Sequence, residues 1–238
     1  MTSTLAAIRE QGLIAVMDGT TPERVFEWAM AVSKGGIELL AIPVRLENVT
    51  EVVSDLDDVD DVNLVVGIAG VLQAEEVSIA VAAGGEFLIS PVVDENIIEA
   101  SKSRGLVTIV GATTPTEVHR AVNAGADLVS IHPVGALGKP EAYFDAMRRA
   151  FPDTPLIVSG GIDVELAPAL LEAGAAAAIV DKGVFPDATE ASALEVITMR
   201  AVALVEVCAD VMGMPKRSSF TEIRASEILE FEDLEVLE

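Results

Sequence analysis

A regular alternation of short β-branched runs with longer amphipathic segments is the feature that most constrains the fold of this chain. Eight apolar runs have the length and composition of buried strands: Leu13–Met17, Ile37–Val44, Asn63–Ile68, Glu86–Ile89, Val107–Val110, Leu128–His132, Leu156–Ser159 and Ala177–Asp181. The segments between them repeat apolar residues at helical spacing: Pro22–Ser33, Val71–Ala83, Asn96–Ser103, Pro115–Asn123, Pro140–Ala150, Val164–Glu172 and Thr189–Val207. Strands that alternate with helices in this way pair in parallel.

Eight such units in a chain of 238 residues predict a closed (β/α)8 TIM barrel. We expect the barrel to span residues 1–212. Residues 213–238 form an acidic C-terminal extension, which is either docked on a neighbouring subunit or solvated. An open, doubly wound sheet is the alternative fold. The chain reads Met17-Asp18-Gly19-Thr20 after its first strand, so it lacks the glycine-rich turn of a dinucleotide-binding sheet.

The chain is strongly acidic, with 39 Asp and Glu residues against 15 Lys and Arg and a formal net charge of −24. A nucleic-acid partner is excluded, because binding to a phosphate backbone needs a basic protein face. An acid-rich, lysine-poor composition around an ordinary apolar core indicates a halophilic protein, with an acidic mesophilic protein as the alternative.

The compartment follows from cysteine usage and from the absence of long apolar runs. Cys208 is the single cysteine of the sequence, which excludes an intramolecular disulfide and indicates a reducing compartment. Met1–Gly12 carries Arg9 and Glu10 and does not have the pattern of a secretory leader. The apolar runs are shorter than the roughly 20 residues that a membrane helix needs. We therefore expect a cytoplasmic protein with no membrane partner.

The loops after the seventh and eighth strands carry the strongest chemical signal. Active sites of such barrels lie at the C-terminal ends of the strands, and these two loops commonly bind phosphate. Ser159-Gly160-Gly161 follows the seventh strand, where glycines let backbone N–H groups approach an anion, and Lys182 follows the eighth. We expect an anion site here. A tight turn at the glycines and an ion pair at Lys182 are the alternatives.

Other polar residues at the same end of the barrel are candidates for catalysis and binding. Arg45 follows the second strand, where it binds a substrate carboxylate or pairs with a neighbouring acid. His132 and Asp18 are candidate general bases. Because the second histidine, His119, lies on a predicted helix, we expect no metal site.

A nucleophilic serine is disfavoured by the sequence. Ser130 and Ser159 are the serines at the ends of the sixth and seventh strands, and neither has an obvious base along the chain. A Ser–His hydrolase is therefore not the expected enzyme class.

Several short phrases, in order from about residue 5 to residue 207, resemble the 2-keto-3-deoxy-6-phosphogluconate and 4-hydroxy-2-oxoglutarate aldolases. The phrases are Gly35-Gly36-Ile37-Glu38-Leu39-Leu40, Pro43-Val44-Arg45, Val66-Gly67, Val71-Leu72, Phe87-Leu88-Ile89-Ser90-Pro91, Val110-Gly111, His132-Pro133 and Ser159-Gly160-Gly161-Ile162. The resemblance implies a (β/α)8 barrel that assembles as a homotrimer. It also implies cleavage of a 2-keto-3-deoxy sugar acid to pyruvate and an aldehyde through a lysine Schiff base, with no metal or other cofactor.

The sequence departs from this family at its catalytic positions. The position of the family's Schiff-base lysine is Ser130, and that of its catalytic glutamate is Ala41. The binding residues remain: Arg45 matches a carboxylate-contacting arginine, Pro91 a proline of the pyruvate pocket, and Ser159, Gly160 and Gly161 the phosphate loop. Serine cannot form the imine, because a Schiff base needs a primary amine.

The prediction from these features is an aldolase-family lyase with atypical catalytic residues and a small-molecule substrate, a 2-keto acid or sugar phosphate. The predicted catalytic residues are Lys182 as nucleophile and His132, Asp18 or Asp181 as base. The predicted substrate-binding residues are Arg45, Pro91, Ser130, Ser159, Gly160 and Gly161. Two alternatives stay open: a non-catalytic sugar-phosphate-binding barrel, and a sugar-phosphate isomerase or epimerase.

Overall fold

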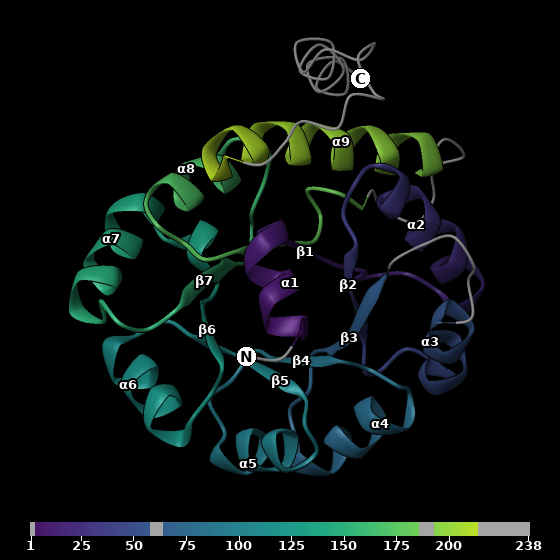
Figure 1. Ribbon diagram of the computed structural model, residues 1–238, viewed down its shortest axis with the longest axis horizontal. Coiled ribbons are helices and arrows are strands. Elements are labelled where there is room, and N and C mark those ends of the chain that lie inside the picture. The colour runs from purple at the N-terminus through teal and green to yellow at the C-terminus, as the bar shows by residue number, and fades with distance from the viewer. Residues whose placement is uncertain (1–2, 58–63, 186–192, 214–238) are drawn as a thin grey trace.

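A computed structural model describes residues 3–57, 64–185 and 193–213, and in it eight parallel strands close into a barrel in sequence order (Figure 1). The strands are β1 (Leu13–Val16), β2 (Leu39–Pro43), β3 (Val65–Ala69), β4 (Phe87–Ser90), β5 (Val107–Ala112), β6 (Leu128–Ile131), β7 (Leu156–Ser159) and β8 (Ala178–Val180). Parallel pairing of β1 with both β2 and β8 completes the ring. The closed ring confirms the predicted (β/α)8 barrel, and the open sheet is wrong.

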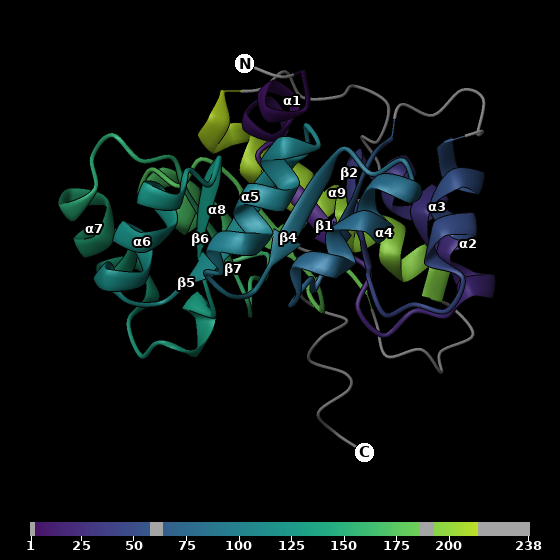
Figure 2. The ribbon, with the colours of Figure 1, turned by 90° about the horizontal axis from the view of Figure 1, so that it is seen from below.

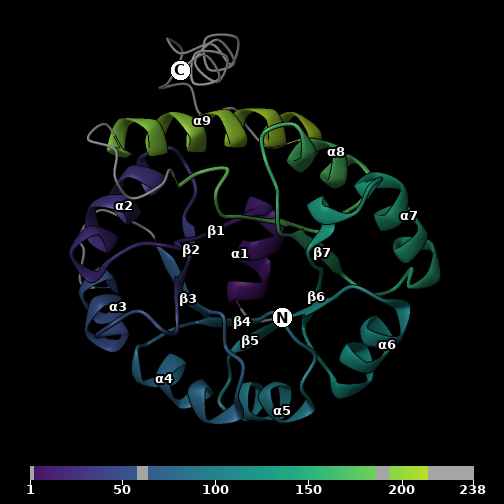
Figure 3. The same ribbon diagram turned by 180° about the vertical axis from the view of Figure 1, so that it is seen from behind.

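Helices surround the barrel on its outside (Figures 1 and 3). They are α2 (Pro22–Lys34), α3 (Val49–Asp57), α4 (Val77–Ala82), α5 (Glu95–Ser103), α6 (Pro115–Ala124), α7 (Pro140–Ala150), α8 (Leu166–Glu172) and α9 (Ala193–Met212), with short 3-10 turns η1 (Ala74–Glu76) and η2 (Val134–Ala136). Proline stands in the first turn of α2, α6 and α7, as predicted. The sequence analysis did not predict α3.

The N-terminal segment forms a further helix, α1 (Ser3–Gln11), which closes one end of the barrel. It lies across the centre of the ring, at the N-terminal ends of the strands (Figures 1 and 2). The side chain of Ile8 is fully buried in the interior, and Gln11 accepts hydrogen bonds from the N–H groups of Glu38 and Leu39 at 2.9 and 3.0 Å. Because α1 fills this end, the opposite, C-terminal end is the open one.

The barrel interior is packed with apolar side chains up to the level of the site. Phe87 is fully buried there, and a side chain at Gly67 would place its Cβ 2.5 Å from the Phe87 ring. Glycine at this position therefore lets the ring fill the axis. Ala41 also lies fully buried in this interior cluster.

Helix α9 completes the outer layer between α8 and α2 (Figure 1). Gly35 permits the close approach of α2, because a Cβ there would lie 2.4 Å from the Cβ of Ala201. Gly213, at φ 65°, follows the last residue of α9, which extends beyond the predicted end at Val207. The predicted acidic extension beyond it, and the predicted start of this helix at 189, lie outside the described residues. No helix in the described ranges is long and apolar enough to cross a membrane.

The stack of Trp28 on Phe185 ties α2 to the segment after β8, and replacing Trp28 by alanine should destabilise the barrel. Trp28 is buried, and its ring centroid lies 5.3 Å from that of Phe185. We expect Trp28→Ala to lower the free energy of unfolding by about 3–5 kcal/mol, because a large cavity is left. Urea unfolding followed by circular dichroism measures the change. Phe26→Ala on the same helix is the control, because Phe26 is 49% exposed. Equal losses in the two variants would contradict the role assigned to the stack.

Candidate active site

A cavity of about 130 Å³ lies on the barrel axis at the C-terminal ends of the strands. Its walls are mostly apolar, from side chains such as Val16, Ile89 and Ile179. The polar and predicted site residues that line it are Ser90, Pro91, Ser130, His132, Ser159, Gly160 and Asp181. The structure therefore brings together residues from β4, β6, β7 and β8 that the sequence analysis had singled out separately. We refer to this space as the central cavity.

Two serines and a histidine form a chain of hydrogen bonds in the central cavity. The Ser130 hydroxyl donates to Ser159 Oγ at 2.7 Å, and Ser159 Oγ lies 2.9 Å from His132 Nδ1. Ser130 and Ser159 are both buried. The sequence analysis found no base for these serines, and the structure corrects it. Ser159 and His132 meet because β6 pairs with β7. The two residues are far apart along the chain, so the sequence does not reveal this contact.

The electrostatic setting keeps His132 neutral. Burial lowers the pKa of His132 below its usual value of 6.5, since desolvation disfavours the charged imidazolium, while the nearby Asp181 carboxylate opposes this shift. A neutral imidazole has one nitrogen that accepts a hydrogen bond. With Nδ1 as that acceptor, Ser159 donates to His132 and accepts from Ser130, so each of the two hydroxyls donates one hydrogen bond along the series.

The backbone around His132 holds the imidazole in place. The Thr113 hydroxyl donates to the His132 carbonyl from the end of β5. On the other side, Gly160 packs so closely that a Cβ there would lie 3.0 Å from His132 Nδ1 and 2.7 Å from the Cβ of Pro133. Gly160 also has φ 82°, a left-handed conformation that favours glycine. The glycine after Ser159 therefore makes room for the histidine.

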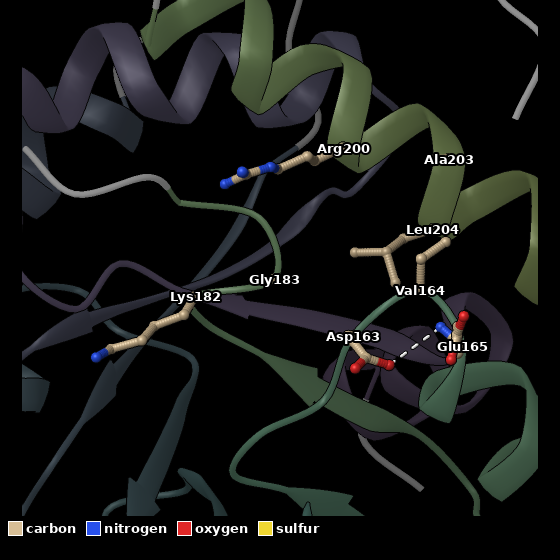
Figure 4. A pocket seen from close by; sticks show the side chains of 8 residues that line it. All are labelled: Asp163, Val164, Glu165, Lys182, Gly183, Arg200, Ala203 and Leu204. Carbon is tan, nitrogen blue, oxygen red and sulfur yellow. Dashed lines mark hydrogen bonds between the residues drawn. The ribbon is translucent and has the colours of Figure 1, made fainter. Parts of the chain in front are cut away.

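A second cavity, of about 310 Å³, lies between the loops after β7 and β8 and helix α9 (Figure 4). Lys182, Gly183 and Arg200 line it together with two acids, Asp163 and Glu165. The Lys182 side chain is exposed, and its amine points away from the Asp163 carboxylate (Figure 4). We refer to this space as the loop cavity. It contains the predicted Lys182, and it adds Arg200, which the sequence analysis missed.

Acidic side chains in and next to the loop cavity accept hydrogen bonds from nearby backbone N–H groups. Asp163 Oδ1 accepts hydrogen bonds from the N–H groups of Glu165 and Leu166, at 3.1 and 2.7 Å, where α8 begins. Asp181, next to Lys182, accepts the Lys182 backbone N–H at 2.6 Å. Lys182 itself does not line the central cavity, although its neighbour Asp181 does.

The remaining predicted site residues lie apart from both cavities. Arg45, Asp18 and Gly161 are exposed in the loops after β2, β1 and β7, and none of them lines the central or the loop cavity. Within the described part of the chain, no salt bridge joins Arg45 to Asp18 or Glu47. The described residues also contain no cluster of three or more side chains that could hold a metal ion.

Comparison with known proteins gives a consistent family. Residues 5–199 match the family model described as KDPG and KHG aldolase. A 2-dehydro-3-deoxy-6-phosphogalactonate aldolase of Escherichia coli (strain K12) is 27% identical over 167 residues, which are 70% of this chain and 80% of that protein. A 2-dehydro-3-deoxy-phosphogluconate aldolase of Treponema pallidum is 27% identical over 152 residues, 63% of this chain and 71% of that protein.

Solved structures share the fold. A structure described as native KDPGal superposes with a TM-score of 0.76 at 23% identity and covers 85% of this chain and 96% of its own. The 2-keto-3-deoxy-6-phosphogluconate aldolase of Zymomonas mobilis ZM4 superposes with a TM-score of 0.75 at 20% identity and covers 84% of this chain and 94% of its own. At these identities the superpositions establish the barrel alone.

The lowered pKa of His132 predicts a pH dependence of stability. The unfolded chain takes up a proton on this residue near pH 6.5, whereas the folded protein takes it up only at a lower pH. The unfolded state therefore binds more protons in between, and the contribution of His132 to stability, complete above pH 6.5, is lost as pH falls through the folded pKa. We expect His132→Asn to lose less stability than the parent between pH 7 and pH 5, measured by urea unfolding. His119→Asn, at an exposed position, should follow the parent. Parallel curves for the parent and His132→Asn would refute this assignment.

Proposed function

The chain belongs to the KDPG and KHG aldolase family, a family of carbon–carbon lyases, and from this premise we propose that it cleaves a phosphorylated 2-keto-3-deoxy sugar acid. The products are pyruvate and a phosphorylated aldehyde. The match over residues 5–199 carries the proposal, and a central cavity with polar groups at the C-terminal end of the barrel supports it.

The loop cavity supports a phosphate on the substrate. Lys182 and Arg200 both line it, two cations in one cavity of a protein whose formal net charge is −24. Gly160 and Gly161, both with positive φ, begin the adjoining loop and can present backbone N–H groups to an anion. The named relatives act on phosphorylated sugar acids. We assign the phosphate to this loop cavity and the keto acid end of the substrate to the central cavity.

The catalytic roles that we propose begin with Lys182 as the amine, which leaves Arg200 and the backbone of Gly160 and Gly161 to hold the phosphate. Lys182 is one residue from Asp181, so the two cavities adjoin at this point of β8. His132, neutral near pH 7, serves as the base, with Asp18 as the alternative on a neighbouring loop. Arg45, in the loop after β2, is our candidate for binding the carboxylate, and Pro91 and Ser130, which line the central cavity, are our candidates for contacting the pyruvyl group.

One observation favours a second candidate function, isomerisation or epimerisation of a sugar phosphate. Among the described residues that line the central cavity there is no lysine, whereas His132 is placed as a neutral base beside two hydroxyls. Proton transfer next to a carbonyl needs a base and a hydrogen-bond donor but no imine.

The assembly and environment of the protein are part of the same proposal. A homotrimer is proposed from the family, with exposed apolar side chains such as Val81 and Val92 as candidates for subunit contacts. A halophilic, cytoplasmic protein of haloarchaeal origin is proposed from the net charge of −24 and the single, buried Cys208. Light scattering and unfolding across a range of KCl concentrations test these two points.

Reductive trapping tests Lys182 as the nucleophile. Pyruvate and borohydride, added to the protein in concentrated KCl, should leave an adduct on Lys182, located by peptide mass mapping, because only an imine is reduced to a stable amine. Lys182→Ala should abolish both adduct and lyase activity. Lys139→Ala, an exposed lysine after β6, is the control and should change neither. Full lyase activity in Lys182→Ala would overturn the role of Lys182. Isomerisation of a sugar phosphate by a protein that forms no imine would favour the second function.

Loss of Arg45 should weaken binding more than turnover. We expect Arg45→Ala to raise KM by about tenfold or more with a smaller effect on kcat, because a charged hydrogen-bonding partner of the carboxylate is removed. Steady-state kinetics on the phosphorylated sugar acid measure both constants. An unchanged KM would exclude Arg45 from the binding site.

A further inference from the structure

We propose that Ser130, Ser159 and His132 form a proton relay that takes the proton from the substrate's C4 hydroxyl, with Ser130 as the group that touches the substrate. This inference rests on the proposed lyase function and identifies the base of that reaction. It makes Ser130 and Ser159 parts of the catalytic machinery, whereas the sequence analysis placed both only among binding residues.

The geometry of the chain carries the relay. Each link is a direct hydrogen bond, 2.7 Å from Ser130 Oγ to Ser159 Oγ and 2.9 Å from Ser159 Oγ to His132 Nδ1. All three side chains line the central cavity, and Ser130 is only 1% exposed. With Ser130 donating to Ser159, the free lone pairs of Ser130 Oγ are available to accept a hydroxyl proton from a ligand in the cavity.

The rest of the cavity leaves few other groups for this step. The position of the family's glutamate is Ala41, buried in the apolar interior. Apart from His132, the only titratable side chain among the described residues that line the central cavity is Asp181, and its Oδ1 already accepts the Lys182 backbone N–H at 2.6 Å. The burial of His132 keeps its imidazole neutral and able to accept a proton near pH 7.

Charged and titratable groups lie near His132 at the end of β8 and on α7. From β8, Asp181 faces the imidazole and favours its protonated form, and Lys182 follows it. From α7, the Tyr143 hydroxyl donates to the Thr113 carbonyl, while Thr113 itself binds the His132 backbone. Asp181 is therefore the group that would stabilise an imidazolium formed during turnover.

The step balances without any further reactant. The C4 hydroxyl gives its proton to Ser130 Oγ as Ser130 passes its own to Ser159 Oγ and Ser159 passes its own to His132 Nδ1. The C4 oxygen forms the aldehyde carbonyl, and the C3–C4 bond breaks. Its electron pair forms the C2–C3 double bond. The π pair of the C2–N iminium bond, or of the C2 carbonyl if no imine is present, moves onto the nitrogen or oxygen. The imidazolium then returns the proton through the two hydroxyls to C3, which yields pyruvate once the imine is hydrolysed.

Variants of Ser159 test the relay, because removal of the Ser159 hydroxyl breaks the hydrogen-bonded chain between Ser130 and His132. We expect Ser159→Ala to lower kcat for cleavage of 2-keto-3-deoxy-6-phosphogluconate by about 100-fold or more, the usual worth of a general base. KM should change by less than about threefold, since binding is largely retained. Ser159→Thr keeps the hydroxyl and should recover most of the activity. Ser101→Ala removes a buried serine of α5 that bonds only within its own helix, and it should match the parent.

Two further readouts separate a relay from a structural role. The acid limb of the pH profile of kcat, set by His132 below pH 6.5, should disappear in Ser159→Ala and persist in Ser159→Thr. Nitrogen-15 NMR of the two histidines, with His119→Asn to assign them, should show His132 protonated on Nε2, with Nδ1 perturbed in Ser159→Ala.

The outcomes distinguish the two proposals. An active parent whose Ser159→Ala variant keeps its kcat and its acid limb overturns the relay and leaves the lyase function standing. A folded parent that binds the sugar acid but does not cleave it overturns the proposed function, and the relay as its base with it. Loss of activity in Ser159→Ala that Ser159→Thr does not recover also counts against the relay, because the hydroxyl is then not the feature that matters.

Discussion

Closure of the parallel barrel is the constraint on which the rest of this structure depends. Parallel pairing of β1 with β8 turns eight separate strand ends into one ring, so that residues far apart in the sequence face a common axis. Ile8 of α1 and Phe87 fill that axis from the N-terminal side with apolar groups. The polar side chains of the central cavity lie at the opposite, C-terminal end, next to the loop cavity.

The two cavities differ in the kind of side chains that line them, charged in one and mostly apolar and neutral in the other. The loop cavity holds fixed charges, with Lys182 and Arg200 beside two acids at the protein surface. The central cavity is mostly apolar, and its hydrogen-bonded chain is neutral from Ser130 to His132. A low-dielectric environment favours such a chain, because neutral hydroxyls lose little on burial when each has a partner, whereas an unpaired charge would lose far more. A phosphate is suited to the first cavity and a reacting carbonyl to the second.

Much of the fold was predictable because the strands are short apolar runs and proline marks the start of several of the helices between them. All eight predicted strands are present, with ends that differ from the predicted bounds by at most two residues. Helix α3 was missed because Val49–Asp57 is short and interrupted by acids, and α1 because its small polar residues leave only Thr4 and Ile8 buried. The (β/α)8 architecture did not depend on either.

The site was predicted less completely than the fold. Sequence position at a strand end correctly placed His132, Ser159, Gly160 and Pro91 around one cavity. It could not reveal the contact of Ser159 with His132, which depends on strand pairing, nor Arg200, which lies two turns into α9. Sequence position also grouped Lys182 with these residues, whereas in the structure the Lys182 side chain lines the loop cavity.

The most direct test of the account is to follow the cleavage itself by proton NMR. The protein, folded in concentrated KCl, is mixed with 2-keto-3-deoxy-6-phosphogluconate, and the pyruvate methyl signal is recorded over time without coupling enzymes. The account predicts pyruvate at a rate proportional to protein concentration, with an equal amount of aldehyde phosphate. A folded protein that leaves the sugar acid intact, or converts it only to an isomer, would contradict the lyase function.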